Sequence, residues 1–254
     1  MGYADEVFDL TGKVVVVTGG SRGLGQEIAC AVARQGADVV IASRKRENCV
    51  QVAHDITKET GRDAMAYGVH VGRWDELEPF VDAVYQRFGR VDVLFNNAGM
   101  TPVYDRLTDV TEKLFDAVIN LNFKGPFRLA ALIGERMHAA GRGSIINVSS
   151  SGSIRPTSKI IPYAGAKAAL NAMSEGLAEG LGPHVRVNTL MPGTFQTDVS
   201  KAWDLDAVTE DRKHRTALRR VGQPPEIIGA ALFLASDASS YTSGTIIRVD
   251  GGMF

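Results

Sequence analysis

A tyrosine and a lysine stand four residues apart, at Tyr163 and Lys167, where an alanine-rich helical stretch begins. Residues at this spacing share one face of a helix, so the phenol and the ammonium can point into the same cleft. A free tyrosine has a pKa of about 10, and a fixed cation nearby lowers that pKa and makes the phenol a proton-transfer group near neutral pH. Taken alone, the pair is also consistent with two surface side chains that share a helix face by chance.

A glycine-rich run at residues 19–25 is suited to holding a dinucleotide. It directly follows the β-branched run at 13–18 and precedes a stretch in which apolar residues recur every four positions. Gly19, Gly23 and Gly25 allow a tight turn and a close approach to a pyrophosphate, and the helix N-terminus supplies amide groups. The alternative is a tight turn without a ligand, but the placement between a buried strand and a helix favours dinucleotide binding.

The residues after the second predicted strand indicate which dinucleotide the chain binds. An NAD site would place an acidic residue there to hold the ribose 2′-hydroxyl. The sequence instead has Ser43, Arg44 and Lys45 at that position. A basic cluster suits a 2′-phosphate, and Arg22 in the glycine run could reach the same group. The sequence therefore predicts NADP(H), with a solvated cationic loop as the alternative.

Short apolar runs alternate with helical patterns along the whole chain. We expect strands near residues 13–18, 37–42, 64–71, 91–95, 144–148, 185–190 and 245–249. Strands of this kind, separated by helices, are typical of a doubly wound parallel sheet. The sequence thus predicts an α/β Rossmann fold with a seven-stranded parallel sheet in a single NAD(P)-binding domain, residues 1–254. The polar stretch at about 194–225 is predicted to be a variable substrate loop.

The composition argues against several other classes of protein. The chain has 254 residues, of which 44% are hydrophobic and 22% charged, and its net charge of -1 gives no global bias toward nucleic acid or an acidic membrane surface. Two cysteines without paired spacing, and histidines without ligand spacing, argue against a disulfide scaffold or a metal site. The acidic N-terminus has no leader pattern, and no stretch reaches the length of a membrane span. We therefore expect a cytoplasmic protein that binds no metal, nucleic acid or membrane.

In their order along the chain, these motifs resemble those of the short-chain dehydrogenase/reductase family, in its single-domain, NADP-preferring branch. The resemblance extends over residues 13–252. The run TGGSRGLG at 18–25 resembles the TGxxxGxG of that family, and NNAG at 96–99 resembles its motif after the fourth strand. Tyr163 and Lys167 match its YxxxK motif.

Further motifs extend the resemblance. Ser150 stands thirteen residues before Tyr163, the usual spacing in the family, which favours it over its serine neighbours. Asn122 begins a run that resembles the family's NxxG, the PGxxxT run at 192–197 resembles the segment that borders the nicotinamide, and residues 243–252 resemble its last strand and turn. The resemblance also implies a homotetramer that buries the helix carrying Tyr163 and the C-terminal strand.

The resemblance implies a role for each side chain of the site. Tyr163 would be the general acid in reduction and the base in oxidation, and Lys167 would hold the nicotinamide ribose hydroxyls and lower the pKa of the tyrosine. Ser150 would hydrogen-bond the substrate oxygen, and Asn122 would keep a water that links Lys167 to bulk solvent. Besides Tyr163 and Lys167, the implied cofactor-binding residues are Gly19, Ser21, Arg22, Gly23, Leu24, Gly25, Ser43, Arg44, His70, Val71, Asn97, Ala98, Gly99, Pro192, Gly193, Thr194 and Thr197.

One position departs from the family pattern. After the third strand the family commonly has an aspartate that contacts adenine, whereas this chain has His70. His70 could accept or donate a hydrogen bond there, or it could be a tolerated substitution. The departure weakens the expected adenine contact and leaves the catalytic residues unaffected.

The predicted function is an NADPH-dependent oxidoreductase that transfers a hydride between the nicotinamide and a carbonyl or secondary alcohol substrate. The sequence resembles both 3-oxoacyl thioester reductases and sugar or small-ketone dehydrogenases. Two alternatives of other classes are a non-catalytic NADP-binding regulatory protein and a lyase or epimerase that uses bound cofactor. The complete Ser-Tyr-Lys-Asn set argues against a protein without turnover.

The sequence leaves the small-molecule substrate and the direction of the reaction open. Specificity is expected in the loop from Thr194 onward, near Met100 and at residues 151–162. Within that loop acidic and basic residues alternate, so no single sign of charge indicates a phosphorylated or carrier-bound substrate. They are Lys201, Asp204, Asp206, Glu210, Asp211, Arg212, Lys213 and Arg215.

Overall fold

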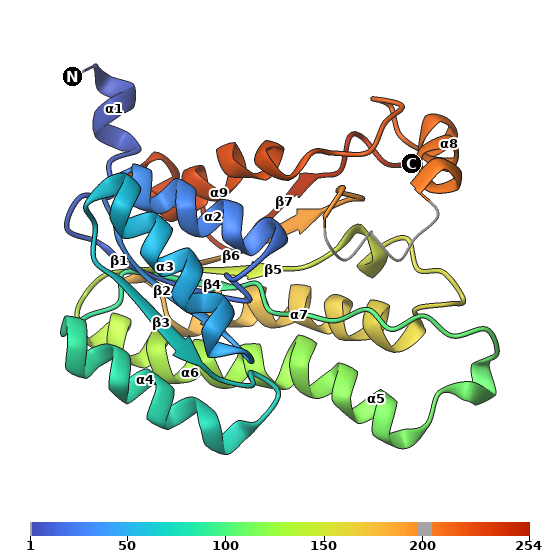
Figure 1. Ribbon diagram of the computed structural model, residues 1–254, viewed down its shortest axis with the longest axis horizontal. Helices are drawn as coiled ribbons and strands as arrows, with labels where there is room; N and C mark the ends of the chain where they lie inside the picture. The colour runs from blue at the N-terminus through green and yellow to red at the C-terminus, as the bar shows by residue number, and fades with distance from the viewer. Residues whose placement is uncertain (1, 198–204) are drawn as a thin grey trace.

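The computed structural model describes residues 2–197 and 205–254, and the strands in this part of the chain form one parallel sheet (Figure 1). Its seven strands are β1 (Val14–Thr18), β2 (Asp38–Ser43), β3 (Ala64–Gly68), β4 (Val93–Asn96), β5 (Gly143–Val148), β6 (Val185–Pro192) and β7 (Ile246–Val249). They lie in the order β3-β2-β1-β4-β5-β6-β7, and all neighbours pair in parallel. The predicted Rossmann fold is confirmed, and each predicted strand overlaps an observed one.

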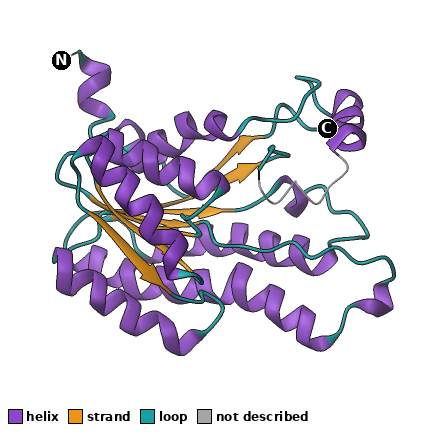
Figure 2. Cartoon of the chain, in the orientation of Figure 1, coloured by secondary structure: helices purple, strands orange, loops and turns teal. Residues whose placement is uncertain are grey.

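Helices cover both faces of the sheet (Figure 2). One face carries α2 (Gly23–Arg34), α3 (Arg46–Thr60) and α9 (Ile228–Ala235), and the other carries α4 (Trp74–Phe88), α5 (Glu112–Ile119), α6 (Gly125–Ala139) and α7 (Ile161–Gly180). A short N-terminal helix, α1 (Tyr3–Val7), lies at one end of the layers (Figure 1). None of the helices in the described part of the chain has the length and apolar character needed to cross a membrane.

β1 is buried on both faces, as its unbroken valine run predicts. Val15 and Val17 belong to the hydrophobic core under α2, α3 and α9, whereas Val14 and Val16 belong to the core under α4 and α6. Successive side chains of a strand point to opposite faces of the sheet, so this single strand contributes to both cores. The residues that follow β1 are therefore attached to a strand that is buried on both faces.

The order of the strands reverses between β1 and β4. Val16 of β1 lies opposite Val40 of β2 on one side and Leu94 of β4 on the other. At such a reversal the connections leave toward opposite faces of the sheet, and a crevice opens beyond the carboxyl ends of the strands. The glycine-rich run follows β1 and the NNAG run follows β4, so the fold brings these two motifs together at the crevice.

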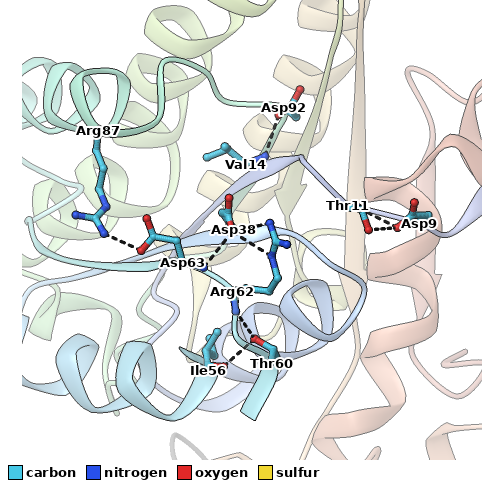
Figure 3. Close-up of polar contacts among 10 residues, drawn as sticks. All are labelled: Asp9, Thr11, Val14, Asp38, Ile56, Thr60, Arg62, Asp63, Arg87 and Asp92. Atoms are coloured by element: carbon cyan, nitrogen blue, oxygen red, sulfur yellow. Dashed lines mark hydrogen bonds and ion pairs between the residues drawn. The ribbon is translucent and has the colours of Figure 1, made fainter. Parts of the chain in front are cut away.

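Polar contacts at the amino ends of the strands hold together the segments that enter the sheet. Asp92 accepts a hydrogen bond from the first backbone nitrogen of β1 at 2.9 Å, and Asp38 accepts from Nε of Arg62 at 3.1 Å (Figure 3). Arg87 forms an ion pair with Asp63 at 2.7 Å. These charged groups are satisfied within the protein and serve the fold.

Two helical elements were not expected from the sequence. The first, α8 (Leu205–Arg215), lies inside the predicted loop at 194–225, and residues 198–204 of that loop lie outside the described residues. Its sequence is polar on all sides, so no apolar stripe marks it as a helix. The second is the π-helical turn η2 (Asn120–Lys124) between α5 and α6. Such turns occur often at functional sites, and this one carries Asn122.

Candidate active site

A cavity of about 1050 Å³ opens at the carboxyl ends of the strands. Of the residues predicted from the motifs, those that line it are Gly19, Ser21, Arg22, Gly23, Leu24, Gly25, Ser43, Arg44, Val71, Asn97, Ala98, Gly99, Ser150, Tyr163, Lys167, Pro192, Gly193, Thr194 and Thr197. His70 and Asn122 are absent from the described lining. A single cavity therefore gathers the ends of six strands, at the size expected of a ligand site.

The glycine turn after β1 lies against the residues after β4. A Cβ atom at Gly25 would lie 2.4 Å from the carbonyl oxygen of Gly19 and 2.4 Å from Nδ2 of Asn97. No side chain fits at these distances, because packed atoms do not approach so closely. Gly19 and Gly23 also have positive φ angles, 67° and 55°, which side chains other than glycine rarely adopt. The turn therefore requires glycine at all three predicted positions.

Thr18, the last residue of β1, joins the two motifs. Its Oγ1 accepts hydrogen bonds from the backbone nitrogens of Asn97 at 3.0 Å and Ala98 at 3.1 Å, and it donates to the carbonyl oxygen of Phe95. Nδ2 of Asn97 donates back to the carbonyl oxygen of Thr18 at 2.9 Å. Thr18 is fully buried, so these reciprocal contacts fix the glycine turn against the NNAG run.

One end of the cavity is polar and basic. Oγ of Ser21 donates to Oγ of Ser43 at 3.1 Å, which links the glycine turn to the end of β2. Arg22, Arg44 and Lys45 line the cavity beside this contact, as expected from the basic cluster in the sequence. Guanidinium and ammonium groups bind phosphate well because they combine charge with several donors. This end of the cavity is therefore suited to a phosphate group.

Tyr163 lies in the first turn of α7 and is largely buried. Burial raises the pKa of its phenol, while hydrogen bonds with Ser150 and Thr101 act in the opposite direction. In the protein alone, Lys167 therefore does not lower the pKa of Tyr163 as predicted. The physical reason is that the phenol loses hydration, and that the ammonium nitrogen lies 5.9 Å from the centre of the tyrosine ring.

Lys167 lies one turn further along α7, and its side chain is buried. Its Nζ donates a hydrogen bond to the carbonyl oxygen of Val148 at 2.7 Å. Burial lowers the pKa of Lys167 from 10.5 to about 7, because the charged ammonium loses its hydration. A lysine with this pKa changes its charge near neutral pH, which is typical of functional sites.

Three consecutive serines follow β5, and the structure separates their roles. Ser150 hydrogen-bonds with the phenol of Tyr163, and its Oγ also accepts from the backbone nitrogen of Gly152 at 3.1 Å. Oγ of Ser149 donates to the backbone carbonyl of Lys167 at 3.3 Å. Ser150 is thus the serine that the structure brings to the tyrosine, in agreement with the spacing argument.

Asn122 is fully buried on the π-helical turn, next to Lys167. Its Nδ2 donates to the carbonyl oxygens of Val118 at 2.9 Å and Met100 at 3.0 Å. A Cβ atom at Gly99 would lie 2.8 Å from Oδ1 of Asn122 and 3.7 Å from Nζ of Lys167. Gly99 therefore forms the cavity wall, and the asparagine supports that wall from behind.

His70 does not contribute to the described wall of the cavity. Its Nδ1 accepts a hydrogen bond from the backbone nitrogen of Gly72 at 3.1 Å, and its own backbone nitrogen donates to Glu76 at 2.8 Å. The neighbours Val69 and Val71 line the cavity instead. The imidazole is engaged in the turn after β3, and the side chains of Val69 and Val71 line the cavity at the place where His70 was expected.

The segment after β6 closes one side of the cavity. A Cβ atom at Gly193 would lie 2.7 Å from Cα of Asp250, so glycine is needed where this segment passes the last strand. Further along, Thr197 approaches the glycine turn, with its Cβ 3.6 Å from the position that a Cβ at Gly23 would take. The PGxxxT run at 192–197 thus passes from the last strand to the glycine turn along the wall of the cavity.

The residues of the cavity fit a nicotinamide dinucleotide. The glycine turn leaves room that any side chain would fill, the adjacent basic end suits a phosphate, and Lys167 offers a buried donor beside Tyr163. Residues 2–197 and 205–254 contain no group of three or more histidine, cysteine, aspartate or glutamate side chains that could hold a metal ion.

Sequence reasoning missed several residues of the cavity. Thr101, Arg155, Lys159 and Met253 all line it, and no motif marks them. Arg155 and Lys159 lie in the segment at 151–162, which was expected to carry specificity without any single residue being identified. Thr101 directly follows the NNAG run and Met100 in the sequence, and this position could have identified it.

Comparisons with known proteins agree with this geometry. A family model described as enoyl-(acyl carrier protein) reductase matches residues 18–254. Dehydrogenase/reductase SDR family member 4 of Oryctolagus cuniculus is 34% identical over 245 residues, which cover 96% of this chain and 94% of that protein. The 3-oxoacyl-(acyl-carrier-protein) reductase FabG of Chlamydia trachomatis is 37% identical over 245 residues, with coverage of 96% and 98%.

A solved structure extends the agreement to three dimensions. The gluconate 5-dehydrogenase of Burkholderia cenocepacia, crystallised with NADP and tartrate, superposes with a TM-score of 0.93 at 32% identity, and 98% of each chain is covered. The match extends over nearly the whole length of both chains. The chain belongs to the short-chain dehydrogenase/reductase family of NAD(P)-dependent oxidoreductases.

Proposed function

We propose that the protein reduces a carbonyl compound with NADPH, and that it catalyses the reverse oxidation of the corresponding secondary alcohol. The observation that carries this proposal is the grouping of Ser150, Tyr163 and Lys167 at one cavity, with the phenol hydrogen-bonded to the serine and the lysine buried beside it. A hydroxyl pair of this kind can bind and protonate an oxygen on which negative charge develops.

Each side chain has a distinct role in this proposal. Bound NADPH would supply the hydride. Tyr163 would donate its proton to the carbonyl oxygen, and Ser150 would donate a hydrogen bond to the same oxygen. Lys167 would hold the nicotinamide ribose hydroxyls and, through its charge, stabilise the phenolate that remains after proton transfer. Asn122 would keep the path of protons from solvent to Lys167 in place.

The preference for NADP(H) over NAD(H) is supported by the basic end of the cavity. Arg22, Arg44 and Lys45 line it together, and no aspartate or glutamate is among the described residues of the wall. An acidic residue would repel a 2′-phosphate, whereas these side chains would attract it. The related dehydrogenase of Burkholderia cenocepacia was crystallised with NADP.

Two substrate classes fit this chemistry, 3-oxoacyl thioesters and sugars or small ketones. The reductase of Chlamydia trachomatis and the dehydrogenase of Burkholderia cenocepacia, which are named for these two classes, are similar to this chain at 37% and 32% identity. Selection among these substrates would fall to the loop at 194–225 and to residues 151–162, which contribute described side chains to the wall of the cavity.

The proposal is tested by NADPH consumption with a panel of 3-oxoacyl thioesters, an enoyl thioester, diketones, ketoses and cyclic ketones, with NADH in parallel. Turnover of a carbonyl compound that is lost in Tyr163→Phe would support carbonyl reduction. Consumption of NADPH with the enoyl thioester alone, or full turnover in Tyr163→Phe, would contradict it. Tight binding of NADPH without any turnover would favour a regulatory protein.

We further propose that the protein works in the cytoplasm as a homotetramer. Small residues at exposed positions of α7, among them Gly165, Ala168, Ala172 and Gly176, support association through this helix. Light scattering of the purified protein coupled to size exclusion would give the mass of the assembly. A monomer that consumes NADPH at the full rate would refute the tetramer and leave the reaction intact.

A further inference from the structure

The cavity carries charge of one sign at both ends. Its described wall contains six basic side chains besides Lys167. The other described lining residues carry no charge, since none of them is a histidine, an aspartate or a glutamate. The basic residues are Arg22, Arg44, Lys45, Arg155, Lys159 and Arg212. Three of them form the basic end assigned above to the phosphate of the cofactor. The other three are not used by the proposed reaction.

We infer that the substrate itself is an anion, a carbonyl compound with a carboxylate or phosphate group held by Arg155, Lys159 and Arg212. This inference rests on the proposed carbonyl reduction and specifies the substrate class. We call these three side chains the distal basic group. A guanidinium pairs with a carboxylate or phosphate through two parallel hydrogen bonds, and a lysine adds a point charge, so the group suits either anion.

The distal basic group and the basic end that follows β1 and β2 come from different halves of the sheet. Arg155 and Lys159 belong to the segment after β5, and Arg212 belongs to the segment after β6. In the strand order, β4 separates β1 and β2 from β5 and β6. The 2′-phosphate assigned to the basic end therefore does not account for the distal basic group.

Arg155 and Lys159 are attached to the segment that joins Ser150 to Tyr163. The backbone nitrogen of Arg155 donates to the carbonyl oxygen of Ser151 at 2.9 Å, so this arginine follows directly on the serine turn. Both side chains are exposed, and neither forms an ion pair with a carboxylate in the described part of the chain. Their charge is available to a ligand that reaches the catalytic hydroxyls.

Arg212 approaches the same cavity from the other wall, on α8. Its Nη1 donates to Sδ of Met253 at 3.7 Å, and a thioether is a weak acceptor. Its Nε is buried without a hydrogen-bond partner, and its Nη2 is paired with Asp211. The side chain of Arg212 is 13% exposed, so donors that are costly to bury stay incompletely satisfied by the protein.

The carboxylates next to Arg212 in the sequence add no negative charge to the described wall of the cavity, although Asp211 pairs with Arg212 itself. Glu210 is exposed and pairs with Lys213 at 2.6 Å, and Asp211 is likewise exposed. Neither of these acids lines the cavity, whereas Arg212 does. In the structure, the side of this loop that lines the cavity is therefore positive, whereas its outer side carries both acidic and basic residues.

The inference is tested by calorimetric titration of the NADPH-saturated protein, in which the cofactor already occupies the basic end after β1 and β2. The probes are glutarate, its neutral diamide glutaramide, and glycerol 3-phosphate. We expect the anions to bind at least tenfold more tightly than the diamide, and more weakly as salt is added. The tighter of the two anions would distinguish a carboxylate from a phosphate substrate.

Two variants and a matched control locate the binding. Arg212→Gln and the double variant Arg155→Gln, Lys159→Gln should each weaken anion binding about tenfold, since each removes charged donors. Lys213→Gln removes a neighbouring charge of the same helix that does not line the cavity, and it should leave the affinity unchanged. Anion binding no tighter than that of glutaramide, or equal effects of Arg212→Gln and Lys213→Gln, would overturn the inference.

A turnover measurement separates this inference from the proposed reaction. Pairs of oxo acids and their methyl esters share one carbonyl and differ in charge. Turnover of both members at equal kcat/KM, lost in Tyr163→Phe, would uphold carbonyl reduction and refute an anionic substrate. Anion binding that depends on Arg212, without NADPH consumption for any carbonyl compound, would uphold the anion site and refute the reaction.

Discussion

The ammonium nitrogen of Lys167 lies 2.7 Å from the carbonyl oxygen of Val148, the last residue of β5. This hydrogen bond ties α7 to the sheet at the point where the cavity begins. It also gives the buried ammonium one acceptor in place of its lost water, which is too little to keep the ordinary lysine pKa of 10.5. The same contact therefore couples the charge of the site to the stability of the fold.

The free energy of unfolding of the cofactor-free protein should rise with pH because of Lys167. The pKa of this lysine is about 7 in the folded chain and 10.5 in the unfolded chain, so the unfolded chain binds more protons between these values. The cost of burial is complete below pH 7 and is relieved as the pH increases. We expect a contribution of about 2 kcal/mol between pH 7 and pH 9.

Urea unfolding of the wild type and of Lys167→Met at pH 7 and pH 9 measures this contribution. The rise should disappear in Lys167→Met and persist in Lys58→Met, which removes an exposed lysine of α3. A rise of the same size in Lys167→Met would assign the effect to other groups.

Tyr163→Phe should bind NADPH with unchanged affinity and lose a factor of about 10² to 10⁴ in kcat, because only the proton donor is removed. Fluorescence titration with NADPH gives the affinity, and NADPH consumption with the best carbonyl substrate gives kcat. A companion variant, Tyr104→Phe, removes a hydroxyl that accepts from the backbone nitrogen of Ile161 at 2.9 Å. We expect it to keep most of the turnover, which would separate proton donation from support of α7.

Gly25→Ala should abolish tight NADPH binding and destabilise the protein by roughly 1–3 kcal/mol, because its Cβ would lie 2.4 Å from the carbonyl oxygen of Gly19. Gly229→Ala is the matched control. This glycine is exposed within α9, and a Cβ there would meet no atom within 4 Å. Its replacement should stabilise the protein by about 0.5–1 kcal/mol. Equal thermal shifts for the two variants would argue against the close approach at the turn.

The double variant Arg22→Gln, Arg44→Gln should reduce the ratio of kcat/KM for NADPH to that for NADH at least tenfold, since both side chains line the basic end of the cavity. Arg46→Gln removes a nearby arginine that is not part of the described wall and should leave the ratio unchanged. An unchanged ratio in the double variant would assign the choice of cofactor to other residues.

The sheet could be predicted because its central strand has an unambiguous pattern. The valine run of β1 is buried on both faces, and the helices on either side repeat their apolar residues with helical spacing. The helix α8 gave no such signal, since it is polar on all sides, and residues 198–204 before it lie outside the described part of the chain. Patterns of burial predict elements that are buried and miss those that are not.

The candidate site could be predicted where backbone geometry demands particular residues. Gly25 and Asn97 were found through the glycine-rich run and the NNAG run, and the structure gives a physical reason for these motifs, because a Cβ at Gly25 would lie 2.4 Å from Nδ2 of Asn97. His70 was placed by analogy, and the turn after β3 engages its ring instead. The roles proposed for Arg155 and Arg212 could not be predicted from the sequence. Which residues of a loop face the cavity depends on packing between segments distant in the sequence.

The hydroxyl of Thr18 and the amide of Asn97 have a further consequence for the binding reaction. Because these groups fasten the loops after β1 and β4 to each other, the cradle for the dinucleotide is already shaped when the chain has folded. Its conformational entropy is lost during folding and not on association. Binding of the cofactor should therefore leave hydrogen exchange at Asn97 and Ala98 slow and nearly unchanged, while the segment after β6 gains protection.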